Sequence, residues 1–249
     1  MRPFLVALAV LTRLPLPTAR GAGAGERARA VPWYPAAGLV LGLCLAVPAA
    51  LLQGLPAFLA ATLTVALWIG LTGAAPLQGL ADTVDGYLGG GGNRSRILTI
   101  MRNHQGGVGA VAAVVLVVLA KTLALGCLIR AGAWGAVVAA PLAGRTLMAG
   151  VLAITPATPP QGPPDSPAPP GLDRAAVLVG VLAGLAGLGL LLGATGAGMA
   201  AVLVALALLL RLLFKRTVGG YTGDLLGTAC EAGEAAVLAL AVWGLGACL

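Results

Sequence analysis

Apolar segments long enough to form helices, separated by short polar connections, run along the whole chain. After the N-terminal stretch they occupy residues 36–53, 57–74, 106–130, 132–154, 175–194, 197–214 and 235–249. Several approach the roughly 20 residues that an α-helix needs to cross a bilayer. The pattern therefore predicts an all-α, polytopic integral membrane protein with about seven transmembrane helices and further interfacial or re-entrant helices that carry acidic motifs, in which residues 1–249 form a single membrane domain.

Two further stretches need separate interpretation. The N-terminal segment Met1–Arg13 is apolar but short, lacks a clean signal-peptide cleavage site and is followed closely by Pro15 and Pro17. We expect a retained helix there, either interfacial or a short membrane helix. The proline-rich stretch 155–171 blocks helix propagation, and we expect it to be a linker.

Composition agrees with a membrane location and makes a soluble domain untenable. Apolar residues make up 59% of the chain and charged residues only 9%, whereas soluble domains carry about 25% charged residues. The 38 glycines suit close packing of helices in lipid. Four cysteines lie far apart without a C-x-x-C pair, and we expect small buried packing residues rather than a disulfide framework or a zinc site. They are Cys44, Cys127, Cys230 and Cys248.

Basic residues predict which side of the membrane each loop faces. They concentrate in alternate connections, whereas the connections between those carry almost no charge apart from Arg130. The positive-inside rule makes the basic connections cytoplasmic. These connections are 18–35, 75–105, 155–174 and 215–234. Topogenic loops that face anionic lipid explain the net charge of +7, so we expect a lipid bilayer and no nucleic acid as partner.

Acidic residues are scarce and grouped. Only eight occur, and five of them form two clusters within the loops predicted to be cytoplasmic. The clusters are Asp82 with Asp85, and Asp224 with Glu231 and Glu234. Gln78, Asp82 and Asp85 stand at i, i+4 and i+7, so on a helix they would share one face. Carboxylates beside hydrocarbon are costly unless paired or bound to a cation, so we expect one oxygen-rich site suited to Mg²⁺ and substrate phosphates.

Other polar groups could complete this site. Lys121 and Arg145 lie within apolar segments, where a charge needs a partner, and the acidic clusters can supply one. Arg94, Arg96 and Arg102 could clamp phosphate. Arg94 and Arg96 are equally well explained as topogenic charges, and Arg102, at the entry to an apolar segment, is the best placed. His104 is the only histidine and could act as a base, although a lone loop histidine is more often incidental. Glycines beside both clusters suit close approach of a phosphate, but they also form ordinary turns.

Several segments in combination resemble the cobalamin synthase family, the adenosylcobinamide-GDP ribazoletransferases. They occur in the family's order, span nearly the whole chain and include the intramembrane Lys121. The segments are Leu11–Pro17 (LTRLPLP), Gly79–Gly86 (GLADTVDG), Ile100–Arg102, Ala143–Arg145 and Gly219–Gly227 (GGYTGDLLG), followed by Glu231 and Glu234.

The resemblance implies a Mg²⁺-dependent transferase in the cell's inner membrane with its active site facing the cytoplasm. Such an enzyme joins adenosylcobinamide-GDP to α-ribazole or its 5′-phosphate and releases GMP; homo-oligomers or complexes with other cobalamin-assembly enzymes stay open. Catalytic roles would fall to Asp82, Asp85, Asp224, Glu231, Glu234 and Lys121. Metal binding would fall to Gln78, Asp82, Asp85 and Asp224, and substrate binding to Gly79, Gly86, Arg102, His104, Arg145, Gly219, Gly220, Thr222 and Gly223.

Two positions depart from the family's usual pattern. An Asp of the family is replaced by Gln78, and its common Asp-Ser pair is replaced by Asn103 and His104. Both changes remove negative charge near the predicted metal. Weaker Mg²⁺ binding, a different substrate and reduced activity are the alternatives that follow.

Three other functions remain open at this stage. A transporter could use the intramembrane charges as an ion or substrate path, although the chain shows no evident repeat. A non-catalytic relative that binds a corrinoid would fit the change at Gln78. Another phosphoalcohol transferase, acting on lipid nucleotides, would share the acidic helix but fits the segment Gly219–Asp224 less well.

Overall fold

The described part of the chain is almost entirely helical. The computed structural model describes residues 2–16, 22–104, 106–158 and 171–248. Its helices are α1 (Arg2–Leu11), α2 (Ala24–Ala30), α3 (Tyr34–Leu51), α4 (Ala57–Thr72), α5 (Ala75–Gly90), α6 (Arg94–Asn103), α7 (Val108–Arg130), α8 (Trp134–Ile154), α9 (Arg174–Thr217) and α10 (Gly223–Gly244), with a 3-10 turn at Val31–Trp33. The all-α prediction is confirmed, and most of the predicted linker 155–171 lies outside the described residues.

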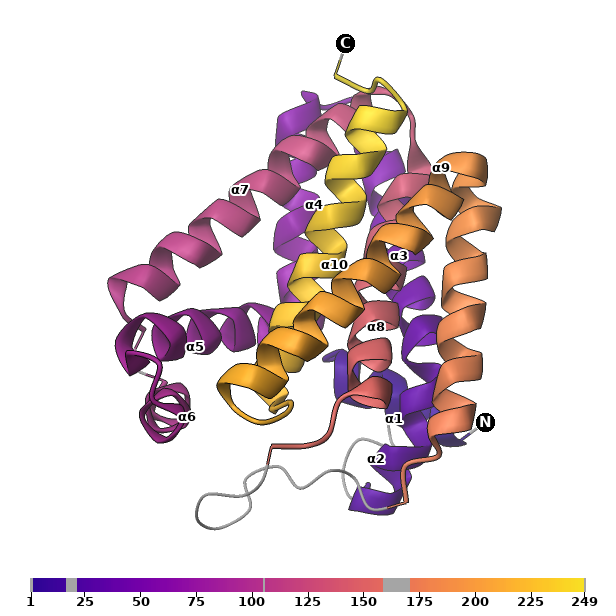
Figure 1. Cartoon of the computed structure of the whole chain (residues 1–249). Helices are drawn as coiled ribbons and strands as arrows, with labels where there is room; N and C mark the ends of the chain where they lie inside the picture. The colour runs from indigo at the N-terminus through magenta and orange to yellow at the C-terminus, as the bar shows by residue number, and fades with distance from the viewer. Residues whose placement is uncertain (1, 17–21, 105, 159–170, 249) are drawn as a thin grey trace.

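Five helical stretches of this part are long and apolar enough to cross a membrane, and a sixth is obtained if the bent pair α4 and α5 counts as one span. One of the five is α9, whose 44 residues are interrupted at Gly193 by a non-helical backbone conformation. Figure 1 shows the chain turning back there, so that two helical arms meet at the turn and diverge from it. These arms match the two spans predicted at 175–194 and 197–214.

The last helix begins much earlier than predicted. The sequence pattern placed a span at 235–249, whereas α10 runs from Gly223 to Gly244. Its first turn is capped by Thr222, whose Oγ1 accepts a hydrogen bond from Leu225 N at 3.3 Å. The prediction was wrong because Glu231 and Glu234 were assigned to the loop before the apolar segment, although they lie inside the helix.

Helix α8 forms the centre of the bundle and packs against α3, α9 and α10. Two glycines of α3 let its backbone approach α8 closely. A methyl group at Gly38 would overlap the backbone at Pro141, and one at Gly42 would overlap the backbone at Val138. Small residues therefore mediate helix association here, as expected for a bundle in lipid.

Helix α5 lies across one end of the bundle. The chain bends by 86° between α4 and α5, and the bend is made by Gly73 and Ala74, both with positive φ. Figure 1 shows α5 nearly perpendicular to α4, with α6 beyond it at the same end as α2 and the turn between α9 and α10. The bent pair is a broken span or a re-entrant loop, and its second helix carries the first acidic cluster, which is consistent with the predicted re-entrant helix.

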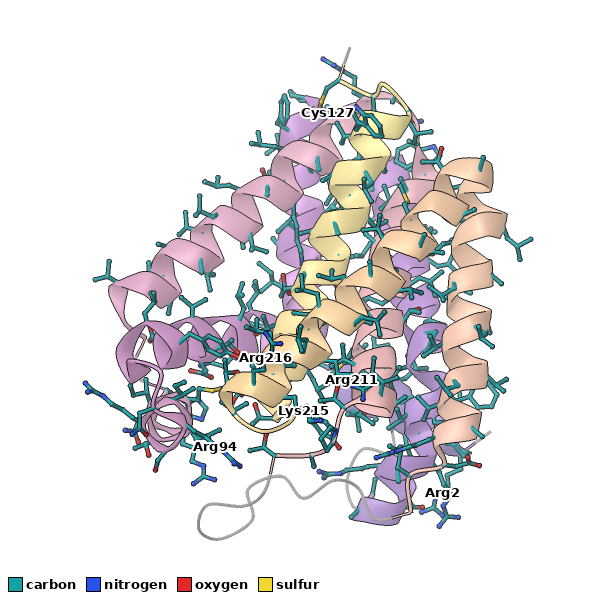
Figure 2. All side chains as sticks on the ribbon, viewed as in Figure 1. Arg2, Arg94, Cys127, Arg211, Lys215 and Arg216 are labelled. Atoms are coloured by element: carbon teal, nitrogen blue, oxygen red, sulfur yellow. A yellow bond between two sulfur atoms is a disulfide. The ribbon has the colours of Figure 1, made fainter. Side chains whose placement is uncertain are left out.

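One disulfide bond joins the opposite end of the bundle. Cys127 near the end of α7 is bonded to Cys248 beyond α10, with their Cα atoms 5.1 Å apart. Figure 2 shows Cys127 at the end farthest from Arg94 of α6. Cys44 and Cys230 are free thiols. The expectation of four unpaired packing residues was wrong because 121 residues separate the bonded pair, and only helix packing brings them together.

We expect two reactive thiols in denatured, unreduced protein purified from membranes, because Cys127 and Cys248 are bonded. Maleimide labelling read by mass spectrometry should add two groups before reduction and four after it. The variant Cys248→Ser should take up one more group without reductant, whereas Cys44→Ser should take up one fewer. Four labels on unreduced wild-type protein would contradict the bond.

Candidate functional site

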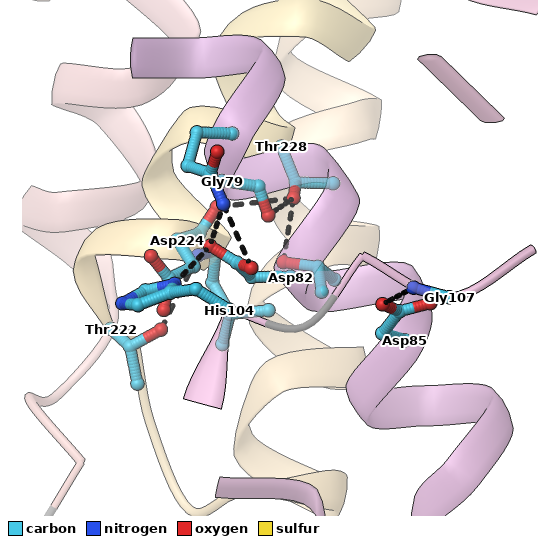
Figure 3. A network of polar contacts seen from close by, with 11 residues as sticks. Gly79, Asp82, Asp85, His104, Gly107, Thr222, Asp224 and Thr228 are labelled. Atoms are coloured by element: carbon cyan, nitrogen blue, oxygen red, sulfur yellow. Dashed lines mark hydrogen bonds and ion pairs between the residues drawn. The ribbon is translucent and has the colours of Figure 1, made fainter. Parts of the chain in front are cut away.

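Asp82 is the buried centre of a polar network on α5. Its side chain is only 3% exposed. The Gln78 amide donates to both of its carboxylate oxygens at 3.0 and 2.9 Å, and His104 Nδ1 lies 2.8 Å from Oδ2. Gln78 reaches Asp82 because the two are one helical turn apart, whereas His104 comes from the left-handed end of α6. The His104 side chain is about half exposed, and the ring edge that carries Nε2 points away from Asp82 (Figure 3).

Asp224 joins this network from the first turn of α10. It lies close enough to Asp82 and His104 to interact with both electrostatically (Figure 3). Gly79 permits this approach, because a side chain at that position would overlap the Asp224 backbone. Thr228, one turn further along α10, hydrogen bonds with Thr83 Oγ1 at 2.8 Å and donates to the Gly79 carbonyl at 3.2 Å. The two acidic clusters therefore meet through Asp82 and Asp224, as predicted.

Asp85 has a different position. Its Oδ2 accepts a hydrogen bond from Gly107 N at 2.5 Å and its Oδ1 accepts one from Ala110 N at 3.2 Å. Figure 3 shows it directed towards Gly107 and away from the Asp82 network. Asp85 thus caps the N-terminus of α7, where a carboxylate satisfies unpaired amides and favours the positive end of the helix dipole.

The donor set of the site suits a cation that is only partly held by the protein. Within the described residues, no three His, Cys, Asp or Glu side chains are arranged as a complete metal site. Asp82 and Asp224 form a close carboxylate pair, and Mg²⁺ commonly takes one or two carboxylates together with water and substrate phosphates. The pair fits that pattern. Gln78 donates its amide to Asp82, and both oxygens of Asp85 face α7.

Glu231 and Glu234 belong to a second cluster inside the bundle. Lys121 Nζ lies 2.6 Å from Glu231 and is also paired with Glu234, and Arg145 pairs with the other oxygen of Glu234. The four side chains are at most 6% exposed. Lys121 also lies 4.5 Å from the ring centroid of Trp68 on α4.

This cluster confirms that the intramembrane cations have acidic partners. It also corrects the expectation that Glu231 and Glu234 form one site with Asp82 and Asp224, since their carboxylates face Lys121 and Arg145. Arg145 is 1% exposed, so its guanidinium is enclosed by the described helices and faces Glu234. The sequence could not separate the two groups, because all the acids of α10 share one helix and one sector.

Most of the predicted substrate-binding glycines contact protein atoms. Gly86 packs against Met101 of α6, and Gly220 packs against the backbone at Pro156. Gly219 has φ of 83°, and the guanidinium of Arg94 lies against it. Gly223 is exposed at the start of α10, next to the capping Thr222. Arg102 lies on the last turn of α6, close in sequence to His104.

Sequence reasoning missed several polar groups that organise the site. The hydroxyls of Thr83 and Thr228 join α5 to α10, and Tyr87 bonds Thr217 at 2.6 Å, joining α5 to the end of α9. The available signal was position: Thr83 follows Asp82, and Thr228 stands one turn after Asp224. That signal is weak, because threonine is common in membrane helices as a donor to its own backbone.

Comparisons with known proteins agree along almost the full chain. A model of the cobalamin-5-phosphate synthase family matches residues 3–242. A Pseudomonas entomophila (strain L48) protein named adenosylcobinamide-GDP ribazoletransferase is 41% identical over 240 residues, covering 96% of this chain and 97% of its own. A Stutzerimonas stutzeri (strain A1501) protein of the same name is 40% identical over 243 residues, covering 96% of each chain. No solved structure matches at a significant level.

We expect Glu234→Gln to destabilise the protein by about 3–5 kcal/mol, because it leaves Lys121 and Arg145 with a single buried carboxylate. Denaturant unfolding in detergent, followed by tryptophan fluorescence, measures the change. The control is Glu26→Gln, which removes an ion pair with the exposed Arg2 and should cost less than about 1 kcal/mol. Equal effects of the two substitutions would rule out a structural role for the buried cluster.

Proposed function

Because the chain belongs to the cobalamin-5-phosphate synthase family, we propose that it is an adenosylcobinamide-GDP ribazoletransferase. It joins adenosylcobinamide-GDP to α-ribazole, or to α-ribazole 5′-phosphate, and releases GMP. The observation that carries the proposal is the meeting of Asp82, Asp224 and His104 at one end of the bundle (Figure 3). These groups come from three separate parts of the chain and form a polar site on an otherwise apolar protein.

The reaction has requirements that this site can meet. A ribose hydroxyl oxygen bonds to the phosphorus that carries the cobinamide, the bond from that phosphorus to the bridging oxygen breaks, and GMP leaves with that oxygen. The protein must align both substrates, balance the charge of the diphosphate and receive the hydroxyl proton. Asp82 holds His104 through Nδ1, so Nε2 on the exposed edge can bind the hydroxyl and accept its proton.

We further propose that Asp82 and Asp224 hold Mg²⁺ together with the substrate diphosphate. When bound, the ion would neutralise charge on the leaving nucleotide. The pairing of two partly buried carboxylates supports this role, since such a pair is stabilised by a shared cation. Gln78 holds the Asp82 carboxylate in place by donating to both of its oxygens.

The proposed orientation has the site facing the cytoplasm from the inner membrane. Basic residues of α6 and of the end of α9, including Arg94, Lys215 and Arg216, lie at the site's end of the bundle (Figure 2). That distribution follows the positive-inside rule. The Cys127–Cys248 bond lies at the other end, and disulfides persist in oxidising compartments outside the cytoplasm. The two observations are independent and favour the same orientation.

A non-catalytic relative that binds a corrinoid is the second candidate. The observation that favours it is Gln78, an amide in the position where the family commonly has a carboxylate. A transporter is disfavoured, because the acids of the two clusters pair in two separate groups, Asp82 with His104 and the two glutamates with Lys121 and Arg145.

The reaction is tested by following GMP release from purified protein given adenosylcobinamide-GDP, α-ribazole and Mg²⁺. We expect Asp82→Asn to lower kcat/KM by about 100-fold or more, because it removes a charge from the proposed metal and a partner from His104. Asp85→Asn should lose less than about fivefold, because asparagine also caps a helix N-terminus. Folded wild-type protein that releases no GMP above background would sink the transferase proposal.

Gln78→Asp should lower the Mg²⁺ concentration that gives half-maximal GMP release. An aspartate there would replace a donor to Asp82 with a second negative charge, and only a bound cation relieves the resulting repulsion. The same variant should be less stable than wild type without Mg²⁺. Gln78→Glu tests whether the carboxylate position matters, and an unchanged Mg²⁺ dependence of both variants would exclude position 78 from the metal environment.

A further inference from the structure

Arg94 reaches from α6 to the turn between α9 and α10. It occupies the first position of α6, just after Asn93, whose side chain caps the helix by accepting from Arg96 N at 3.1 Å. Its guanidinium lies against Gly219. A Cβ atom at that position, as any other residue would have, would lie only 3.0 Å from both Cζ and Nη1 of Arg94. Gly219 has φ of 83°, a conformation that favours glycine, so its lack of a side chain suits both the turn and the arginine.

The hydrogen-bonding capacity of this guanidinium is not used within the described protein. Nε is shielded from solvent and has no hydrogen-bond partner among the described residues. No carboxylate of those residues forms an ion pair with Arg94. A half-buried arginine that is positioned by the backbone and still has its donors available matches the way proteins bind phosphate, since a guanidinium engages two oxygens at once.

The place of Arg94 relates it to the carboxylate site. The turn that it contacts continues from Gly219 through Thr222 into Asp224 at the start of α10. The end of α9 that enters this turn carries Lys215 and is joined to α5 by the bond between Tyr87 and Thr217. Arg94 thus contacts the beginning of the turn whose other end carries Asp224, the carboxylate that interacts with Asp82. An anion that shares a cation with the carboxylates would find Arg94 beside it.

We propose that Arg94 and the backbone at Gly219 form the binding site for the diphosphate of the nucleotide substrate. The identity of the nucleotide in this inference rests on the proposed function. The site itself requires only that the ligand is a nucleoside diphosphate. Arg94 is a substrate-binding residue here, and Gly219 positions it. Arg96 lies on the same helix but is exposed, so it provides a matched control of equal charge.

The test measures equilibrium binding of GDP and of guanosine to purified protein in detergent with Mg²⁺, and it requires no turnover. Arg94→Ala should weaken GDP binding by about 10- to 100-fold, the range for a lost charged hydrogen bond. It should leave guanosine binding within about twofold of wild type. Arg96→Ala should change neither by more than about twofold. Arg94→Lys keeps the charge without the planar fork and should be intermediate.

Thermal unfolding of each variant tests whether a loss of GDP binding is caused by a loss of folding. Arg94→Gln replaces Arg94→Ala if the alanine variant does not fold. The proposal is overturned if wild-type protein does not bind GDP, if Arg94→Ala binds GDP like Arg96→Ala, or if guanosine binding falls equally. GMP release is measured separately. Arg94-dependent GDP binding without turnover would refute the proposed reaction and leave this site standing.

Discussion

Four charged side chains inside an apolar bundle are the constraint on which the other positions depend. A charge buried in an apolar bundle is costly unless it is paired, so Lys121 of α7 and Arg145 of α8 must each face the glutamates of α10. This requirement fixes three helices relative to one another. Helix α10 extends from the cluster to Asp224, and α7 extends to Gly107, where Asp85 holds its end. The buried ion pairs therefore set the relative positions of the helices that carry the site.

The site of Asp82 and Asp224 has a different requirement. Its two carboxylates must lie close together and still leave room for a substrate. Helix α5 leaves the bundle at the bend after α4 and crosses the end of α10. Gly79 permits the crossing, and Thr228 fastens it with hydrogen bonds to α5. Asp82 and Asp224 thereby lie where α5 crosses the first turns of α10. Charged, water-soluble substrates can reach such a position, while the neighbouring helices keep it partly desolvated.

The two ends of the bundle differ chemically, and the difference follows from the compartments they face in the proposed orientation. One end has arginines, lysine and paired carboxylates, and the other has a disulfide between α7 and the chain beyond α10. The bond ties α7 to the chain four residues beyond α10, and Lys121 and Glu234 join the same two helices inside the bundle. Helices α7 and α10 are thus held together at two levels, which keeps the Asp85 cap and Asp224 in a constant relation.

Properties that depend on neighbouring residues were determined by the sequence alone. Hydropathy placed the segments at 57–74, 106–130 and 132–154 close to α4, α7 and α8, and helical spacing correctly put Gln78 within reach of Asp82. The clustering of acids also predicted that Asp82 and Asp224 would lie near each other. Each of these signals lies within a few turns of one helix.

Only the tertiary structure decided which charged groups pair. Lys121 and Glu234 are 113 residues apart and Cys127 and Cys248 are 121 apart, so no local pattern joins them. The same holds for His104 with Asp82, which are brought together by the turn after α6. Helix packing settled these partners, because the energy of a pair depends on distance and burial in space, and neither is a property of sequence order.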